Sequence, residues 1–151
     1  MTIPTITVIN PPVTSAEEPI IASLVAEDER LAFLPKFFKS KIMLKAESLT
    51  YGWMREFCSL YKGGYWNFYT LSNGGFYMAP VMDSALIMLR CDMNGFKGRL
   101  SSHAAGIIVT LYMLNYLVCD EENEYLIPAY YQLREFASQH AEKKLIYQAI
   151  D

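Results

Sequence analysis

The chain has 151 residues, of which 52% are apolar and 19% charged, so it is long enough for a folded domain and too apolar for a disordered tail. Its net charge of −3 is far too small for an imitation of duplex DNA, which carries one charge per roughly 1.7 Å. The same balance disfavours a protein whose binding depends mainly on phosphate contacts.

The cysteines and the apolar segments indicate where the protein resides. Cys58, Cys91 and Cys119 form no Cys-x-x-Cys pair and no Cys/His cluster, so we expect reduced core thiols and no zinc site. The first residues do not have the pattern of a signal peptide, and the nearly apolar run 104–119 is shorter than a membrane span of about 20 residues. These features predict a cytoplasmic protein without a membrane segment.

The N-terminal residues divide into an arm and a first helix. Residues 1–15 are rich in proline and threonine, and we expect an extended or disordered arm there, followed by a single domain over 16–151. Residues 17–26 are predicted to form a packing helix, with Pro19 in its first turn.

Two further helical segments follow. Asp28 is a candidate N-cap, and Pro35 is expected to divide the next segment into two short helical pieces. Residues 44–61 then predict a longer helix, because apolar side chains recur every three or four residues and lie on one face: Ala46, Leu49, Trp53, Phe57 and Leu60.

The aromatic stretch GGYWNFYTLSNGGFYMAP, residues 63–80, predicts a β-hairpin. A two-residue type I′ turn at Asn73-Gly74 would place Leu71 opposite Phe76 and Tyr69 opposite Met78. That face would pack on helices, while Trp66, Phe68 and Tyr77 would share the other. We favour burial of this second face over an exposed binding patch, so we expect the stretch to be mostly core, with an exposed rim at Tyr65, Trp66 and Asn73.

Two more strands and a group of helices complete the predicted fold. Residues 85–91 and 96–100 are expected to pair through Asn94-Gly95, with Asp92 opposite Lys97. Ser101 or Ser102 can cap a central helix that is apolar nearly all round over 104–119, and shorter helices follow from Asp120 and over 145–150. The fold class is therefore α+β: one compact domain, with an antiparallel meander of three to four short strands packed with about five to six helices.

Candidate site residues are few. His103 and His140 lack metal-ligand spacing, and no nucleophile elbow or phosphate-binding glycine motif occurs, so we predict no catalytic residue, no metal and no cofactor. The residues that could form an exposed aromatic and polar patch for a partner are Tyr65, Trp66, Asn73, Tyr77 and His103.

Four blocks of the sequence, in this order, closely resemble the ArdB/KlcA antirestriction proteins of plasmids and genomic islands: DERLAFLPKFF, LTYGWMREFC, GGYWNFYTLSNGGFYMAP and LSSHAAGIIVTLYMLNYL. The resemblance runs from about residue 28 to the end. It implies a compact α+β fold and a non-enzymatic inhibitor of type I restriction-modification enzymes. Asn67 and His103 stand where relatives carry acidic residues, which could change the spectrum of targets.

Two functional hypotheses follow. The first is an antirestriction protein that protects incoming mobile DNA by contacting the type I complex or an associated host factor, without imitating DNA; a homodimer is compatible with it. The alternative is a weak DNA-binding module, because residues 31–119 carry nine bases against four acids and the hairpin is rich in aromatic rings that could stack on bases.

Overall fold

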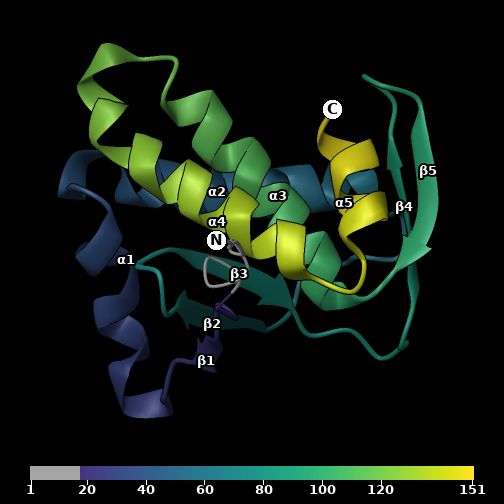
Figure 1. Cartoon of the computed structure of the whole chain (residues 1–151), viewed down its shortest axis with the longest axis horizontal. Coiled ribbons are helices and arrows are strands. Elements are labelled where there is room, and N and C mark those ends of the chain that lie inside the picture. The colour runs from purple at the N-terminus through teal and green to yellow at the C-terminus, as the bar shows by residue number, and fades with distance from the viewer. Residues whose placement is uncertain (1–17) are drawn as a thin grey trace, which may run out of the picture.

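The computed structural model describes residues 18–151, so the predicted arm at 1–15 lies outside the described residues. Figure 1 shows α3 in the middle of the molecule, with one sheet below it and a β-hairpin to its right. The elements in chain order are β1 (Ala22–Leu24), η3 (Glu27–Ala32), α1 (Phe33–Phe37), α2 (Ser40–Phe57), β2 (Trp66–Leu71), β3 (Phe76–Pro80), β4 (Ile87–Cys91), β5 (Phe96–Leu100), α3 (Ser102–Leu117), η4 (Glu121–Leu126), α4 (Ile127–Gln139) and α5 (Lys143–Ile150).

The predicted first helix is wrong, because residues 22–24 form the strand β1. This strand pairs antiparallel with β2, with Ser23 opposite Thr70, and the Ser72 and Val25 amides extend the ladder by donating to the Ile21 and Phe68 carbonyls. The first sheet therefore has the order β1-β2-β3. Pairing with β2 overrides the local helix propensity here. The preceding residues Ile20 and Ile21 also have a high β propensity.

The segment before α2 forms two short helical pieces, as predicted, but Pro35 does not separate them. The 3₁₀ helix η3 ends at Ala32 and α1 begins at Phe33, so Pro35 lies in the first turn of α1. Proline is tolerated there because the first amides of a helix have no carbonyl partner within it. The predicted Asp28 cap is also displaced, since Ala26 holds the N-cap position.

The predicted hairpin forms with a different register. Its turn has three residues, with Gly74 at φ 96° and the Leu71 amide donating to the Gly75 carbonyl at 2.8 Å. As a result Tyr69 lies opposite Tyr77, not opposite Met78. The shift by one residue moves Tyr77 to the face that carries Tyr69, because alternate strand residues point to opposite sides.

Both faces of the β2–β3 hairpin are covered, which confirms the prediction of burial. On one face Phe68 stacks on Phe33 with ring centroids 4.5 Å apart, and Phe76 stacks on Phe37 at 4.1 Å. On the other face Tyr77 stacks on Phe136 of α4. The aromatic stretch that stands out in the sequence is mainly a core.

The strands β4 and β5 form a separate two-stranded sheet, so the strands do not make one continuous meander. Their register differs by two residues from the prediction: Arg90 lies opposite Lys97, and Cys91 opposite Phe96. Both charged side chains are exposed, so water screens their repulsion. The α+β class and the antiparallel pairing are as predicted.

The central helix α3 explains how the two sheets share one core. Its Ser101 N-cap accepts from the Ala104 amide, as predicted, and eleven of its sixteen residues are buried. Gly106 lies so close to β3 that an added Cβ would stand 2.2 Å from the Met78 carbonyl oxygen. The hydroxyl of Thr110 accepts from the Met78 amide at 3.2 Å, which gives this N–H group of β3 a hydrogen-bond partner.

The remaining helices surround α3. In α2 the buried side chains are Ala46, Thr50, Met54 and Phe57, whereas Leu60, predicted to face the core, is 61% exposed beyond the helix end. Asp120 caps η4 by accepting from the Glu122 amide at 3.0 Å. Within residues 18–151, no helix is both long and apolar enough to cross a bilayer.

Candidate functional site

The five predicted patch residues do not form one exposed surface. Trp66 is 3% exposed and Tyr77 is 2% exposed, so neither ring is available to a partner. The indole N–H of Trp66 donates to the Tyr61 hydroxyl at 2.9 Å, which satisfies its only polar group inside the core. The predicted patch is therefore wrong for these two residues, because helices cover both sides of the sheet.

Asn73 and Tyr65 have structural contacts of their own. The Asn73 amide donates to the Gln132 carbonyl at 3.0 Å, while its carbonyl accepts from the Gly75 amide, so this side chain ties the hairpin turn to α4. Tyr65 is 51% exposed, and the guanidinium of Arg30 lies 4.3 Å from its ring centroid. Tyr65 remains accessible but is separate from Asn73.

His103 lies on α3 against the tyrosines of the first sheet. Its Nδ1 is 2.8 Å from the Tyr77 hydroxyl, and its ring centroid is 5.0 Å from that of Tyr69. Burial lowers the pKa of His103, as does His140, while Glu142 opposes that change; burial also raises the pKa of Tyr77. These directions favour a neutral imidazole that accepts from a protonated phenol.

The neighbouring polar groups serve as caps. Glu142 accepts from the Ser101 amide at 2.9 Å and from the Ser101 hydroxyl at 2.5 Å. Nδ1 of His140 accepts from the Glu142 amide at 3.0 Å, so it is not free to activate the serine as a base. In the part of the chain that the structure describes, no three His, Cys, Asp or Glu side chains are grouped as a metal site would require.

The cysteines are only partly as predicted. Cys58 and Cys91 are buried free thiols, but Cys119 is exposed beyond the end of α3. Burial raises the pKa of Cys91 to about 11, so this thiol stays protonated near neutral pH.

A groove that the sequence analysis did not identify lies between α2 and the β4–β5 hairpin. It has a volume of about 400 Å³. Leu49, Trp53 and Phe57 of α2 form its apolar floor, and Met93 from the hairpin turn stands 71% exposed at its edge. We call this the α2 groove. The sequence signal for it was Gly52, a glycine inside a predicted helix beside Trp53.

Four charged side chains line the same groove. Lys45 and Glu56 belong to α2, and Arg90 and Asp92 belong to the hairpin; we call these four the rim. All four are exposed, and none forms an ion pair with another residue in 18–151. The α2 groove thus combines an apolar floor with charges of both signs, of which only Lys45 has an aromatic partner, the Tyr116 ring at 5.5 Å, among the described residues.

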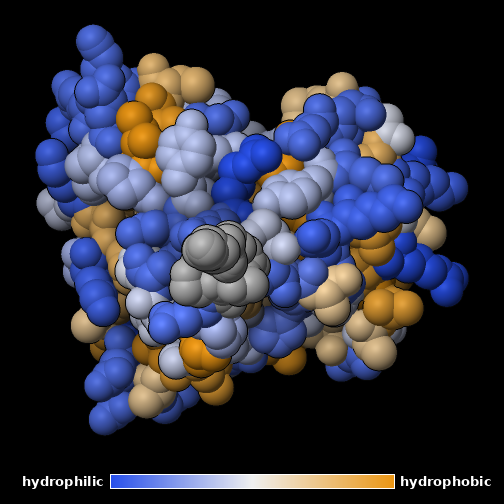
Figure 2. All heavy atoms as spheres, in the orientation of Figure 1, coloured by the Kyte–Doolittle hydropathy of each residue, from blue (hydrophilic) through white to orange (hydrophobic). Residues whose placement is uncertain are grey.

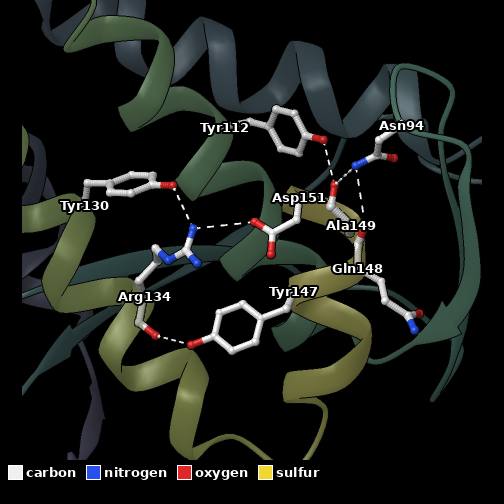
Figure 3. A network of polar contacts seen from close by, with 8 residues as sticks. All are labelled: Asn94, Tyr112, Tyr130, Arg134, Tyr147, Gln148, Ala149 and Asp151. Carbon is white, nitrogen blue, oxygen red and sulfur yellow. Dashed lines mark hydrogen bonds and ion pairs between the residues drawn. The ribbon is translucent and has the colours of Figure 1, made fainter.

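The hairpin wall of the α2 groove is fixed to the C-terminal helix (Figure 3). The Asn94 amide donates to the Ala149 carbonyl at 2.6 Å, and the Tyr112 hydroxyl donates to the same carbonyl at 2.7 Å. Arg134 lies 3.6 Å from the Asp151 carboxylate, which ties the end of α5 to α4. The turn that carries Asp92 and Met93 is therefore held against the core.

The face of the molecule seen in Figure 2 is mostly polar where the described residues are drawn. Figure 2 shows it largely hydrophilic, with apolar side chains in scattered patches and a hollow between the region of α3 and α4 at the upper left and that of α5 and the β4–β5 hairpin at the upper right. Isolated apolar side chains on a surface are ordinary and do not by themselves indicate binding.

Comparisons with known proteins agree with this architecture, an α+β protein with two antiparallel sheets around a buried helix. Two Escherichia coli proteins named antirestriction protein KlcA are similar: one is 50% identical over 88% of this chain and 94% of its own length, the other 46% identical over 89% and 97%. The uncharacterized protein YafX of Escherichia coli K12 is 36% identical over 93% of both chains.

A solved structure gives the same result for the fold. It matches with a TM-score of 0.80 and 47% sequence identity, over 89% of this chain and 96% of that one. That work describes KlcA and ArdB as having a novel fold and antirestriction activity against type I DNA restriction systems in vivo but not in vitro. Residues 59–151 also match the family described as antirestriction protein. The chain belongs to this antirestriction family.

Proposed function

We propose that this protein inhibits type I restriction-modification enzymes in the cytoplasm and so protects incoming mobile DNA, acting through protein contacts and not as a DNA mimic. The observation that carries the mechanism is the charge. A mimic of about 30 Å of duplex would need roughly 18 phosphate-like charges, whereas the whole chain has a net charge of −3.

The behaviour of the related KlcA and ArdB proteins supports an indirect action. Inhibition in vivo but not in vitro is expected if a component present in cells is missing from a purified reaction. The partner would be the assembled type I complex in its cellular state or an associated host factor. A non-enzymatic role agrees with a histidine, serine and glutamate whose polar atoms are used in capping.

The alternative, a weak DNA-binding module, loses its main support from the placement of the hairpin rings. Trp66, Phe68 and Tyr77 are all at most 6% exposed, so they cannot stack on bases. The basic residues of the middle segment would then act alone, and their binding would weaken steeply as salt rises.

The function can be tested with cells that carry a type I system. Unmodified phage should plate with higher efficiency when the protein is produced, and phage already modified should plate equally with and without it. Equal plating of unmodified phage in both strains would reject the proposed function. A fluorescently labelled duplex titrated at low and moderate salt would separately reveal any phosphate-driven binding.

A further inference from the structure

The α2 groove contains a glycine that no contact within residues 18–151 requires. Gly52 lies inside the helix Ser40–Phe57, and a Cβ added there would meet no atom of the described chain within 4 Å. Its backbone is not in the left-handed region either. Glycine is among the least favourable residues inside a helix, and no contact in the described part of the chain explains its use here.

The position of Gly52 places it beneath a ligand that would lie along α2. Lys45, Gly52 and Glu56 are spaced by seven and four residues, so they follow one face of the helix. The line from Lys45 to Glu56 is about 16 Å long at 1.5 Å per residue. Without a side chain at its middle, this face lets a partner approach the helix backbone closely.

The composition of the α2 groove indicates what kind of partner it fits. Leu49, Trp53 and Phe57 offer an apolar floor of the kind that receives a bulky side chain of a protein partner. The rim carries two cations and two anions, and none of them is in an ion pair within 18–151, although Lys45 lies 5.5 Å from the centroid of the Tyr116 ring. A ligand of a single charge sign would therefore leave two of the four without an opposite charge. A strip of apolar residues flanked by both charges is typical of an amphipathic helix.

We propose that the α2 groove receives an amphipathic helix of a partner protein, with a bulky apolar side chain seated over Gly52 and flanking residues of both charges paired with the rim. This inference rests on the proposed function, because it names the surface by which the inhibitor would contact its cellular partner. The hairpin wall is already held in place by Asn94, so binding needs no rearrangement of the turn.

The test uses the full chain in cells with a type I system. Gly52→Trp fills the site, Gly52→Ala adds only a methyl group, and Arg55→Trp places the same indole on an exposed part of α2 outside the groove. We expect Gly52→Trp to lower phage protection by about tenfold or more, which corresponds to a tenfold loss of affinity. Gly52→Ala should lower protection by less, because its methyl group lies beneath the seated side chain, and Arg55→Trp should protect like the wild type.

Folding is controlled by circular dichroism and melting of each purified variant. If Gly52→Trp does not fold, Glu56→Lys replaces it, because this exposed change reverses one rim charge without filling space. A photo-crosslinking residue at Ser48 in the groove should also yield a protein adduct that Gly52→Trp abolishes, whereas the same residue at Arg55 should yield none.

Several results would overturn this assignment. One is full protection by folded Gly52→Trp, or by Glu56→Lys where that variant is used; another is no adduct at Ser48. A dimer that Gly52→Trp converts to a monomer would show that a second copy occupies the groove. A low-molecular-weight cell filtrate that raises the melting temperature of the wild type alone would indicate a small ligand. If the wild type gives no protection, the proposed function fails, and the Ser48 adduct alone decides whether the groove binds a protein.

Discussion

Two glycines in two helices show how differently a missing side chain can be used. At Gly106 in α3, a Cβ would stand 2.2 Å from the Met78 carbonyl oxygen and 2.6 Å from the Ala79 Cα, so the contact with β3 requires glycine. At Gly52 in α2, a Cβ would meet nothing within 4 Å. The first glycine is explained by the fold, whereas no contact within residues 18–151 explains the second.

The largest expected effect is that of Gly106→Ala. The methyl group would collide with backbone atoms that cannot rotate away, so α3 and β3 must separate, and we expect a loss of about 3 kcal/mol in the free energy of unfolding. Urea denaturation followed by circular dichroism measures it. A variant that unfolds at the wild-type urea midpoint would contradict the close approach of the two elements.

The second prediction concerns the polar contact at the same junction. Thr110→Val leaves the buried Met78 amide without its acceptor, and we expect a cost of about 1–3 kcal/mol. Thr50 in α2 provides a matched control, since its buried hydroxyl only donates back to the Ala46 carbonyl one turn earlier. We expect Thr50→Val to lower the free energy of unfolding by less than Thr110→Val in the same urea assay. Equal decreases would show that the hydrogen bond between α3 and β3 contributes no more to stability than the one within α2.

The third change is Gly52→Ala, which should have the opposite sign. Alanine suits a helix interior better than glycine, so we expect stability to rise by about 1 kcal/mol and the melting temperature by about 2–4 °C. Differential scanning calorimetry measures both. A destabilised variant would mean that α2 itself needs glycine, and the contrast between the two helices would disappear.

The smallest expected effect is the pH dependence due to His103. Its folded pKa lies below the ordinary value of 6.5, chiefly through burial, so as pH falls from that value the unfolded state takes up the proton first. Stability contributed by the neutral imidazole is thus present at higher pH and declines as pH drops below about 6.5. His103→Gln should make the difference between the urea midpoints at pH 7.5 and 5.5 smaller than in the wild type. An unchanged difference would show that other groups cause the loss of stability at low pH.

Much of the fold could be predicted from residue patterns. The central helix was identified correctly because a long run that is apolar on every side can be stable only when surrounded by protein. The strand β1 was missed because its partner is β2, which lies far along the chain. The first hairpin was misregistered because Ser72-Asn73-Gly74-Gly75 suits turns of two or three residues, and local sequence does not distinguish them.

The site was harder to predict than the fold. Exposure of Trp66 and Tyr77 depends on which helices cover each sheet face, and that is decided by contacts between distant segments. Gly52 was visible in the sequence as a helix-disfavouring residue. Only the structure shows that Gly52 borders open space, whereas Gly106 lies against the backbone of β3.

The bond between Asn94 and Ala149 links a surface to a chain end that is 55 residues away in sequence. Proteolytic trimming of the last three residues would delete the carbonyl that accepts from both Asn94 and Tyr112, together with the carboxylate beside Arg134. The β4–β5 turn would then keep only the longer bond of 3.4 Å from the Asn94 amide to the Gln148 carbonyl. Residues 149–151 in this way support the hairpin wall of the α2 groove from a distant part of the sequence.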